Sequence, residues 1–350
     1  MQQGEKTMPK QEGKEKATLP DYVVKQLKHK RYGIVGNHSA VQICTYNKEA
    51  IKGGEKHACY KQKFYGIDCH RCAQVSPSVM WCNENCVFCW RPMEFMKDVN
   101  LDNKVIDEPA EIIKGAIKER QKLLTGLGGL PMLDKERFAE AQLPSHWAIS
   151  LSGEPTLYPK ICEMIAEIKA LPSTKSVFLV TNAQLPDVFR KMAANQSFWP
   201  TQLYVSLDAP NEEMFKKINR SIYKDGWKRL NESLGIIGPL ATRKIIRMTI
   251  IRGVNDQPEH YADWTRIIKQ ANPDFVEVKS YMHIGMSRQR LSRGHMLSHE
   301  EVRAFSNGLN EQLGYIFKDE SERGRITLLV RQDYKDKSTF LDFANSKQSN

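Results

Sequence analysis

The chain has 350 residues, 41% of them hydrophobic, and its 52 Lys and Arg against 41 Asp and Glu give a net charge of +11. That length suffices for a sizeable core, and the sequence holds no run of roughly 18–20 apolar residues that could cross a membrane. The polar N-terminus lacks the apolar stretch of a secretory signal, so we expect a cytoplasmic protein. The basic balance suits a polyanionic partner such as nucleic acid, although many proteins without one are equally basic.

The first part of the chain falls into two segments. Residues 1–18 are rich in Lys, Glu, Gln and Gly, so we expect a disordered tail. Residues 19–75 form a cysteine-rich N-terminal extension in which only the run DYVVKQLKHKRYGIVG predicts a short helix.

From residue 76 to residue 310, predicted strands alternate with amphipathic helices. The strands AISL, VFLV, LYVSL and FVEV are nearly continuous apolar runs, as expected where both faces of a sheet are covered. At least five such repeats, without an early Gly-x-Gly-x-x-Gly, favour an α/β barrel, open or closed, over a dinucleotide-binding fold. Residues 311–350 then add a helix and strand extension and a tail.

Polar side chains follow several of these strands. They are Glu154, Asn182, Ser206, Asp208 and Asn255. In parallel barrels the chemistry lies at the carboxyl ends of the strands, so these residues are candidates for one site. Each could also be part of a loop without a role.

Eight cysteines are distributed unevenly, at positions 44, 59, 69, 72, 82, 86, 89 and 162, so that seven fall within one short segment. In a reducing compartment such clustering indicates metal or redox chemistry rather than disulfides. Cys162 lies on the apolar face of a predicted helix and is expected to be a core thiol.

Cys82, Cys86 and Cys89 supply three thiolates on one short loop. A [4Fe–4S] cluster normally takes four ligands, so three would leave one iron open; a zinc site completed by Cys72 is the alternative. The spacing C-x3-C-x2-C, with an aromatic residue before the last cysteine, resembles the radical S-adenosylmethionine (SAM) superfamily. That resemblance implies a partial (β/α)6-type radical SAM barrel with a cysteine-rich N-terminal extension. It also implies that SAM chelates the open iron and is cleaved to a 5′-deoxyadenosyl radical.

The segment SGEPT after the first barrel strand resembles that superfamily's GGEP motif, with Ser152 in place of the first glycine. The resemblance implies that Glu154 contacts the amino group of SAM. Asn182, Ser206, Asp208 and Asn255 are further candidates for binding this cofactor.

Cys44, Cys59, Cys69 and Cys72 could form a zinc knot, a Cys69–Cys72 redox pair or a second [4Fe–4S] cluster. The segments ICTYNK, HACYKQKFYGIDCHRCAQVSPSVMWCNENCVFCWRP, LSGEPTLYP and VKSYMHIGMSRQRL resemble the archaeal form of the 4-demethylwyosine synthase family. That resemblance, over about residues 20–335, implies a second cluster in the extension.

By the same resemblance, Cys44, Cys59 and Cys72 hold the second cluster and Cys69 is spare, although its spacing to Cys72 leaves the choice between them open. Lys61 takes the place of a lysine that forms a Schiff base with pyruvate. A desolvated lysine can attack a ketone. Without the resemblance, however, the basic stretch around Lys61 would indicate an ordinary surface lysine. Alternatively, the open iron of the second cluster binds pyruvate.

The family's reaction condenses N1-methylguanosine-37 of tRNA(Phe) with pyruvate to give 4-demethylwyosine, releasing CO2, methionine and 5′-deoxyadenosine. The resemblance therefore implies a tRNA partner. The basic loop with Arg288, Arg290 and Arg293 is the candidate for contacts to tRNA phosphates. The alternative is that this loop is basic and solvated and has no binding role. We also expect a separate electron donor of the ferredoxin or flavodoxin type, and a monomer. The alternatives are a radical SAM enzyme acting on a small molecule or peptide, and a zinc-stabilised RNA-binding protein without catalysis.

Overall fold

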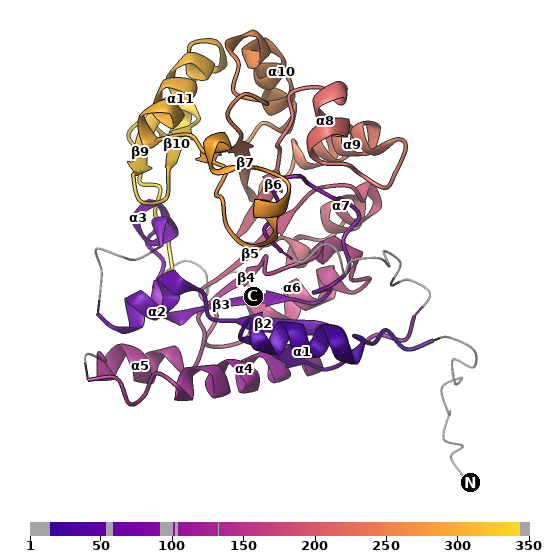
Figure 1. The fold of residues 1–350 in the computed structure, drawn as a ribbon, viewed down its shortest axis with the longest axis vertical. Helices are drawn as coiled ribbons and strands as arrows, with labels where there is room; N and C mark the ends of the chain where they lie inside the picture. The colour runs from indigo at the N-terminus through magenta and orange to yellow at the C-terminus, as the bar shows by residue number, and fades with distance from the viewer. Residues whose placement is uncertain (1–14, 54–58, 92–100, 102–103, 132, 344–350) are drawn as a thin grey trace.

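The computed structural model describes residues 15–53, 59–91, 101, 104–131 and 133–343 (Figure 1). Most of the expected disordered tail, residues 1–14, lies outside the described residues. The rest of that segment is placed, since Lys16 forms an isolated bridge with Val105 and Ala17 is buried.

The described residues form one sheet in the order β1-β2-β3-β4-β5-β6-β7-β8-β10-β9. The strands are β1 (Tyr32–Val35), β2 (Ser39–Gln42), β3 (Cys72–Ser76), β4 (His146–Ile149), β5 (Ser176–Thr181), β6 (Gln202–Ser206), β7 (Arg243–Ile250), β8 (Phe275–Ser280), β9 (Ile316–Ser321) and β10 (Ile326–Val330). Strands β3 to β8 are parallel and follow chain order, whereas the pairs at both ends are antiparallel. This arrangement confirms the predicted α/β fold with a partial (β/α)6 barrel. The division expected after residue 75 falls inside β3.

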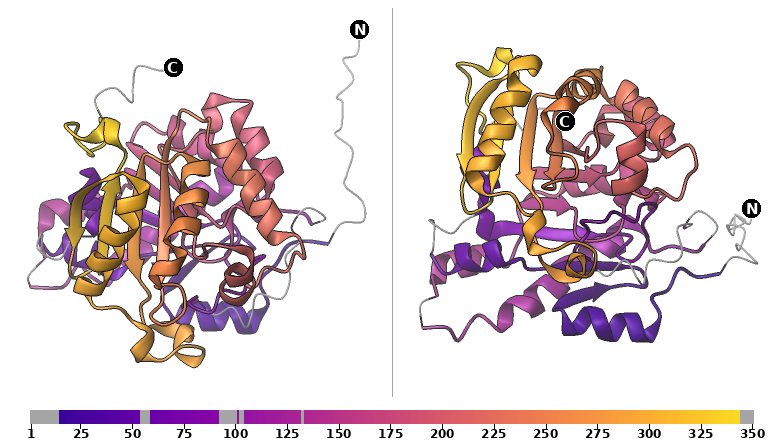
Figure 2. Two further views of the ribbon diagram at one scale, coloured as in Figure 1. Left: turned by 90° about the horizontal axis from the view of Figure 1, so that it is seen from above. Right: turned by 45° about the horizontal axis from the view of Figure 1, so that its top comes forward.

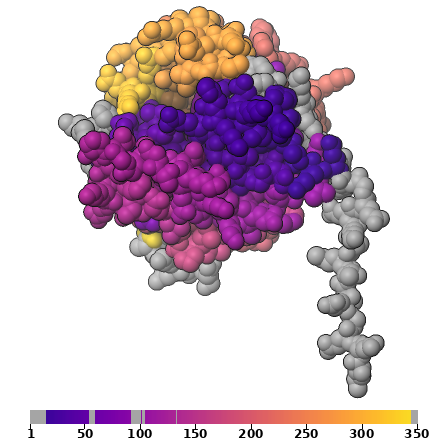
Figure 3. All heavy atoms as spheres, turned by 60° about the horizontal axis from the view of Figure 1, so that its bottom comes forward, coloured from indigo at the N-terminus to yellow at the C-terminus, as the bar shows by residue number. Residues whose placement is uncertain are grey.

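The helices are α1 (Asp21–His29), α2 (Thr45–Ile51), α3 (Tyr60–Tyr65), α4 (Pro109–Thr125), α5 (Lys135–Ala141), α6 (Ile161–Ala170), α7 (Pro186–Ala193), α8 (Glu212–Ile218), α9 (Gly226–Ile237), α10 (Tyr261–Ala271) and α11 (His299–Leu313). Figures 1 and 2 show the sheet curling around an interior with most helices on its outer side. The hairpin β1–β2 packs against α4, and Figure 3 shows this face with the N-terminal segments in indigo beside those in magenta. No helix in the described part of the chain is both long and apolar enough to cross a membrane.

Alternate residues of each parallel strand belong to different cores. On β5, Val177 and Leu179 pack into the large core between the sheet and the outer helices, which also holds Cys162 as expected. Phe178 instead faces the interior of the barrel. Both faces are therefore buried, which explains the unbroken apolar runs in the sequence.

Helix α3 lies on the inner face of the sheet. Its Tyr60, Phe64 and Tyr65 pack against inward-facing residues of β5, β6, β7, β8 and β10. Lys63 on the exposed side of the helix forms an ion pair with Asp319 of β9 at 2.7 Å. The open barrel is thus partly filled by a helix from the cysteine-rich extension.

One carboxylate organises this interior. Glu277 of β8 is fully buried and accepts hydrogen bonds from the hydroxyls of Tyr65 at 2.6 Å, Tyr60 at 3.1 Å and Tyr204 at 3.2 Å. Burying a carboxylate is costly unless its oxygens are hydrogen-bonded, and here both are. The three tyrosines therefore tie α3 to β6 and β8.

We expect Tyr65→Phe to lower the free energy of unfolding by about 1–3 kcal/mol, because it removes a donor from a buried carboxylate. Urea denaturation measures the change. Tyr223→Phe is the control, since no described residue hydrogen-bonds to the Tyr223 hydroxyl, and it should leave stability unchanged. Equal stability of Tyr65→Phe and the unsubstituted protein would contradict the role given to Glu277.

Candidate functional site

Cys82, Cys86 and Cys89 lie in the loop after β3, at the carboxyl edge of the parallel strands, and none forms a disulfide. The Cys86 thiol donates to the carboxylate of Glu84 at 3.2 Å, and Asn219 donates to the same oxygen at 3.0 Å. Burial raises the pKa of Glu84 to about 8 and raises those of Cys82 and Cys86 above the usual thiol value. The three predicted thiols therefore lie on one loop at the predicted edge, and Cys82 and Cys89 are close enough to Cys86 to raise its pKa further.

The loop after β4 holds this cysteine loop from one side. The backbone N–H of Glu154 donates to the carbonyl of Trp81 at 2.7 Å, and the Ser78 hydroxyl donates to the carbonyl of Glu154 at 2.7 Å. The preceding residue, Gly153, has φ +71°, and a Cβ there would lie 1.9 Å from the backbone carbonyl oxygen of Ser78. Only glycine fits such a contact.

The loop after β8 holds the opposite side. Arg290 donates to the carbonyl of Val87 at 3.2 Å and to that of Cys89. Gly285 has φ +56°, and a Cβ there would lie 2.2 Å from the carbonyl oxygen of Trp90. The cysteine loop is therefore clamped between two strand-end loops that are far apart in sequence.

A third contact comes from the turn after α8. The N–H of Val87 donates to the carbonyl of Ile218 at 2.9 Å, and the N–H of Ile222 donates to that of Asn83 at 3.0 Å. The cysteine loop thus has backbone partners on three sides.

The basic loop predicted to bind RNA divides into two roles. Arg288 and Arg293 are exposed and stay candidates for phosphate contacts. Arg290 is partly buried, and its guanidinium is hydrogen-bonded to the cysteine loop. The structure therefore favours a positioning role for Arg290.

Glu154 connects the ends of β4 and β5. Its carboxylate accepts hydrogen bonds from the Thr181 hydroxyl at 2.6 Å and from the N–H of Asn182 at 2.9 Å, and burial raises its pKa. The side chain of Asn182 donates to Asn83 in the cysteine loop at 2.7 Å. Both predicted residues thus reach the cysteine loop, Glu154 through its backbone N–H and Asn182 through its side chain, which orients Asn83, a residue that sequence reasoning did not select.

Ser206, Asp208 and Asn255 lie at the ends of the next two strands. Asp208 accepts from the N–H of Thr249 at 2.8 Å, and burial raises its pKa to about 6. Asn255 donates to the carbonyls of Asp208 and Thr249, both at 2.9 Å, and accepts from the N–H of Ile251 at 2.7 Å. Because the Asn255 amide is occupied by the protein, it positions Asp208. Ser206 is partly exposed and accessible from the interior.

The donor set at this edge fits an iron–sulfur cluster. Three free thiols meet there, and next to them Asn83 Nδ2, Glu84 Oε1 and Ser152 Oγ are buried without a hydrogen-bond partner among the described residues. Across those residues, no three Cys, His, Asp or Glu side chains are arranged for a single metal ion. A four-iron cluster needs its thiolates farther apart than a single ion does.

The second group of cysteines is held together by backbone contacts. Asn47 donates to the carbonyls of Cys69 at 2.7 Å and Cys72 at 2.9 Å, and its N–H approaches the Cys44 sulfur at 3.4 Å. A hydrogen bond from the Cys69 thiol lowers the pKa of Cys59 to about 7. Cys44, Cys59, Cys69 and Cys72 are therefore neighbours, as a shared cluster requires.

Arg91 lies within electrostatic range of both groups of cysteines. Burial lowers the pKa of this arginine, and charge on Tyr32, Cys89 and Cys44 opposes that shift. Cys89 belongs to the first group and Cys44 to the second, so one side chain lies close to both.

Lys61 of α3 points into the barrel interior. Its Nζ lies 4.2 Å from the centre of the Tyr204 ring and 4.7 Å from that of Phe178. Burial lowers its pKa, while the Glu277 carboxylate opposes the shift. Lys61 is therefore not a surface lysine, and its amine can be neutral and nucleophilic.

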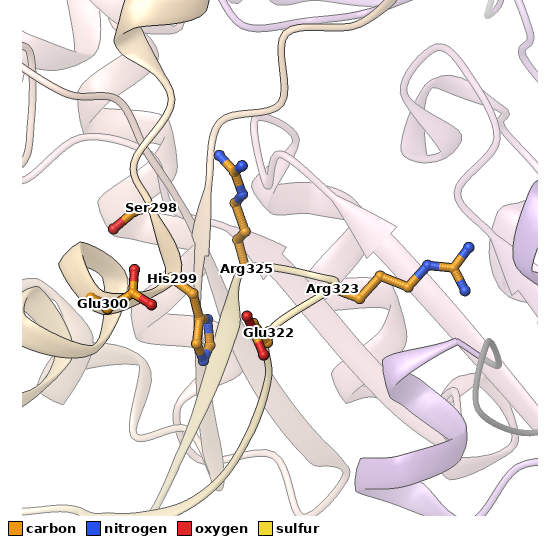
Figure 4. Close-up of a pocket in the computed structure, with 6 residues that line it drawn as sticks. All are labelled: Ser298, His299, Glu300, Glu322, Arg323 and Arg325. Atoms are coloured by element: carbon orange, nitrogen blue, oxygen red, sulfur yellow. The ribbon is translucent and has the colours of Figure 1, made fainter.

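A separate cavity of about 510 Å³ lies between the start of α11 and the β9–β10 turn (Figure 4). Its lining includes Arg323 and Arg325, which point away from one another. Because these side chains do not converge, we assign this cavity no ligand.

Sequence reasoning missed Asn83, Glu84, Arg247 and Glu277. Asn83 and Glu84 lie inside the WCNENC motif and could have been selected from it. Glu277 and Arg247 are charged residues within apolar strand runs, which is itself a signal of a polar barrel interior.

We expect Arg290→Gln to reduce the iron retained at the first group of cysteines, because the loop loses its hydrogen bonds from the β8 side. Iron and sulfide counted after anaerobic reconstitution and gel filtration measure the effect. Arg288→Gln is the matched control from the same loop and should keep the full iron content. Equal iron in both variants would contradict the clamping role of Arg290.

Comparison with known proteins matches residues 77–265 to the radical SAM superfamily and residues 270–331 to the wyosine base formation family. A tRNA 4-demethylwyosine synthase of Pyrococcus horikoshii is 42% identical over 92% of this chain and 92% of that protein. The Methanocaldococcus jannaschii synthase is 37% identical over 91% of this chain and 98% of that protein.

Among solved structures, TYW1 with a lysine–pyruvate adduct bound superimposes with a TM-score of 0.78 at 35% identity, over 90% of this chain and 97% of the other. Membership of the radical SAM superfamily implies SAM and a [4Fe–4S] cluster, for which Cys82, Cys86 and Cys89 are the candidate ligands. The relatives' names also imply a tRNA substrate. The chain thus belongs to the tRNA 4-demethylwyosine synthase family, the radical SAM enzymes of wyosine formation.

Proposed function

We propose that this enzyme condenses N1-methylguanosine-37 of tRNA(Phe) with pyruvate to give 4-demethylwyosine, with release of CO2, methionine and 5′-deoxyadenosine. The observation that carries the proposal is the position of Lys61, whose desolvated amine lies over Tyr204 and Phe178 inside the barrel. A surface lysine would have neither the reduced pKa nor the enclosed position that imine formation needs. The adduct in the 35% identical relative supports the same chemistry.

The remaining residues have separate tasks. When bound at Cys82, Cys86 and Cys89, the iron–sulfur cluster supplies the electron that cleaves SAM. Ser206, Asp208, Glu154 and Asn182 are proposed to surround the cofactor at the strand ends, with Asn255 holding Asp208. Arg288 and Arg293 are proposed to contact tRNA phosphates.

We further propose that Cys44, Cys59 and Cys72 hold a second [4Fe–4S] cluster. Cys72 is the first residue of β3 and shares its inward-facing side with Gln74 and Ser76, so its thiol is directed to the same interior as Lys61. Cys69 is more deeply buried than the other three, and it lies close enough to Cys59 for the two thiols to shift each other's pKa. Electrons are proposed to come from a separate ferredoxin or flavodoxin type donor, and the enzyme is proposed to act in the cytoplasm as a monomer.

Lys61→Ala should abolish 4-demethylwyosine formation while release of 5′-deoxyadenosine continues. The assay combines anaerobically reconstituted enzyme, SAM, a reductant, pyruvate and tRNA bearing N1-methylguanosine, followed by mass spectrometry of nucleosides. Lys63→Ala, on the exposed side of the same helix, is the control and should make product normally. Undiminished product from Lys61→Ala would remove the Schiff-base role, and unmodified tRNA in all variants would remove the substrate assignment.

Cys72→Ala should lower the iron content by about four atoms per chain, the content of one [4Fe–4S] cluster. Cys69→Ala should retain the iron of both clusters, since it is proposed to be spare. Iron and sulfide analysis after reconstitution distinguishes the two. Loss of iron from Cys69→Ala alone would reverse the assignment.

A further inference from the structure

Three basic side chains lie on the inner face of strands β7 and β8. Arg243 donates to the carbonyl of Thr339, and Lys279 donates to that of Gly324. Arg247, which lies between them, donates its guanidinium to no described residue. It is partly buried, so it remains accessible from the interior.

The nearest carboxylate cannot fully satisfy Arg247. Glu277 is its direct partner in the β7–β8 register, but the Glu277 oxygens already accept three tyrosine hydroxyls, and no ion pair within 4.0 Å joins the two side chains among the described residues. A desolvated guanidinium without a hydrogen-bonded partner is costly. The interior therefore carries an unused binding position for an anion.

Arg247 is close to Lys61. Its Cζ lies 5.9 Å from the ring of Tyr60, the residue directly before Lys61 on α3. The β6 partner of Arg247 is Ser206. Tyr204, over whose ring the Lys61 amine lies, is two residues from Ser206 on the same strand, a distance of roughly 6.5–7 Å. Arg247 is thus nearer than the Lys61 amine to the carboxyl ends of the parallel strands, where the cysteine loop lies.

We propose that Arg247 binds the carboxylate of the 2-oxo acid that Lys61 attacks and so makes the site prefer an α-keto acid to an uncharged ketone. This rests on the proposed condensation at Lys61. There, Nζ forms a C=N bond to the keto carbon, and the keto oxygen leaves as water with the two amine hydrogens. The neighbouring carboxylate keeps its charge, and the planar fork of an arginine matches its two oxygens.

The test compares pyruvate with methyl pyruvate, which has the same ketone but no charge. Each is trapped on the reconstituted enzyme with cyanoborohydride, which delivers hydride to the imine carbon while water supplies the proton. Intact mass spectrometry measures the adduct at Lys61. Arg247→Gln should reduce the preference for pyruvate over its ester by roughly 10- to 100-fold, the range for a lost charge-assisted contact.

Two further variants keep the result interpretable. Arg247→Lys retains a cation and should show an intermediate preference, which a merely structural role would not predict. Lys279→Gln removes a nearby basic side chain that already has a carbonyl partner and should retain the full preference. An unchanged preference in Arg247→Gln, or an equal loss in Lys279→Gln, overturns the assignment.

Equilibrium dialysis of radiolabelled pyruvate separates this inference from the proposed function. If the unsubstituted enzyme forms no trapped adduct, the role of Lys61 fails, and Arg247 is then judged by binding alone. Weaker pyruvate binding to Arg247→Gln than to Lys279→Gln supports the proposal in that case, and equal binding overturns it.

Discussion

The candidate site depends on close backbone contact between the cysteine loop and the loops after β4 and β8. Gly153 and Gly285 both have positive φ, and each faces a carbonyl oxygen of the cysteine loop at a distance that leaves no room for a Cβ. The contacts are therefore made by backbone, which moves less than side chains do. Because the loop backbone places the three thiols, these contacts set the spacing that a cluster requires.

A second constraint comes from the open shape of the barrel. An unfilled interior would leave the aromatic side chains of β5, β6 and β8 in water, and α3 covers them with Phe64 and Tyr65. The Glu277 carboxylate then holds α3 in place through hydroxyls on both sides of Lys61, at Tyr60 and Tyr65. The same packing that fills the barrel therefore fixes where the lysine amine lies.

The sequence predicted those parts of the molecule that are determined locally. The parallel strands were readable because burial on both faces makes them apolar runs, and the thiols at Cys82 and Cys89 because their spacing is short. The hairpin β1–β2 and strand β9 were not predicted from the sequence. Strand β9 is only partly buried at every residue, so its sequence shows no periodic pattern. The Tyr60–Glu277 pair joins residues 217 positions apart, and no local pattern shows such a contact.

The basic loop after β8 shows the same limit for function. Its arginines look alike in sequence, because composition reports charge and not the partner that charge finds. The structure separates them: Arg290 is committed to the carbonyls of Val87 and Cys89, while Arg288 and Arg293 remain exposed. One short segment thus holds the cysteine loop through one arginine and presents two others to solvent, a division of roles that composition alone does not show.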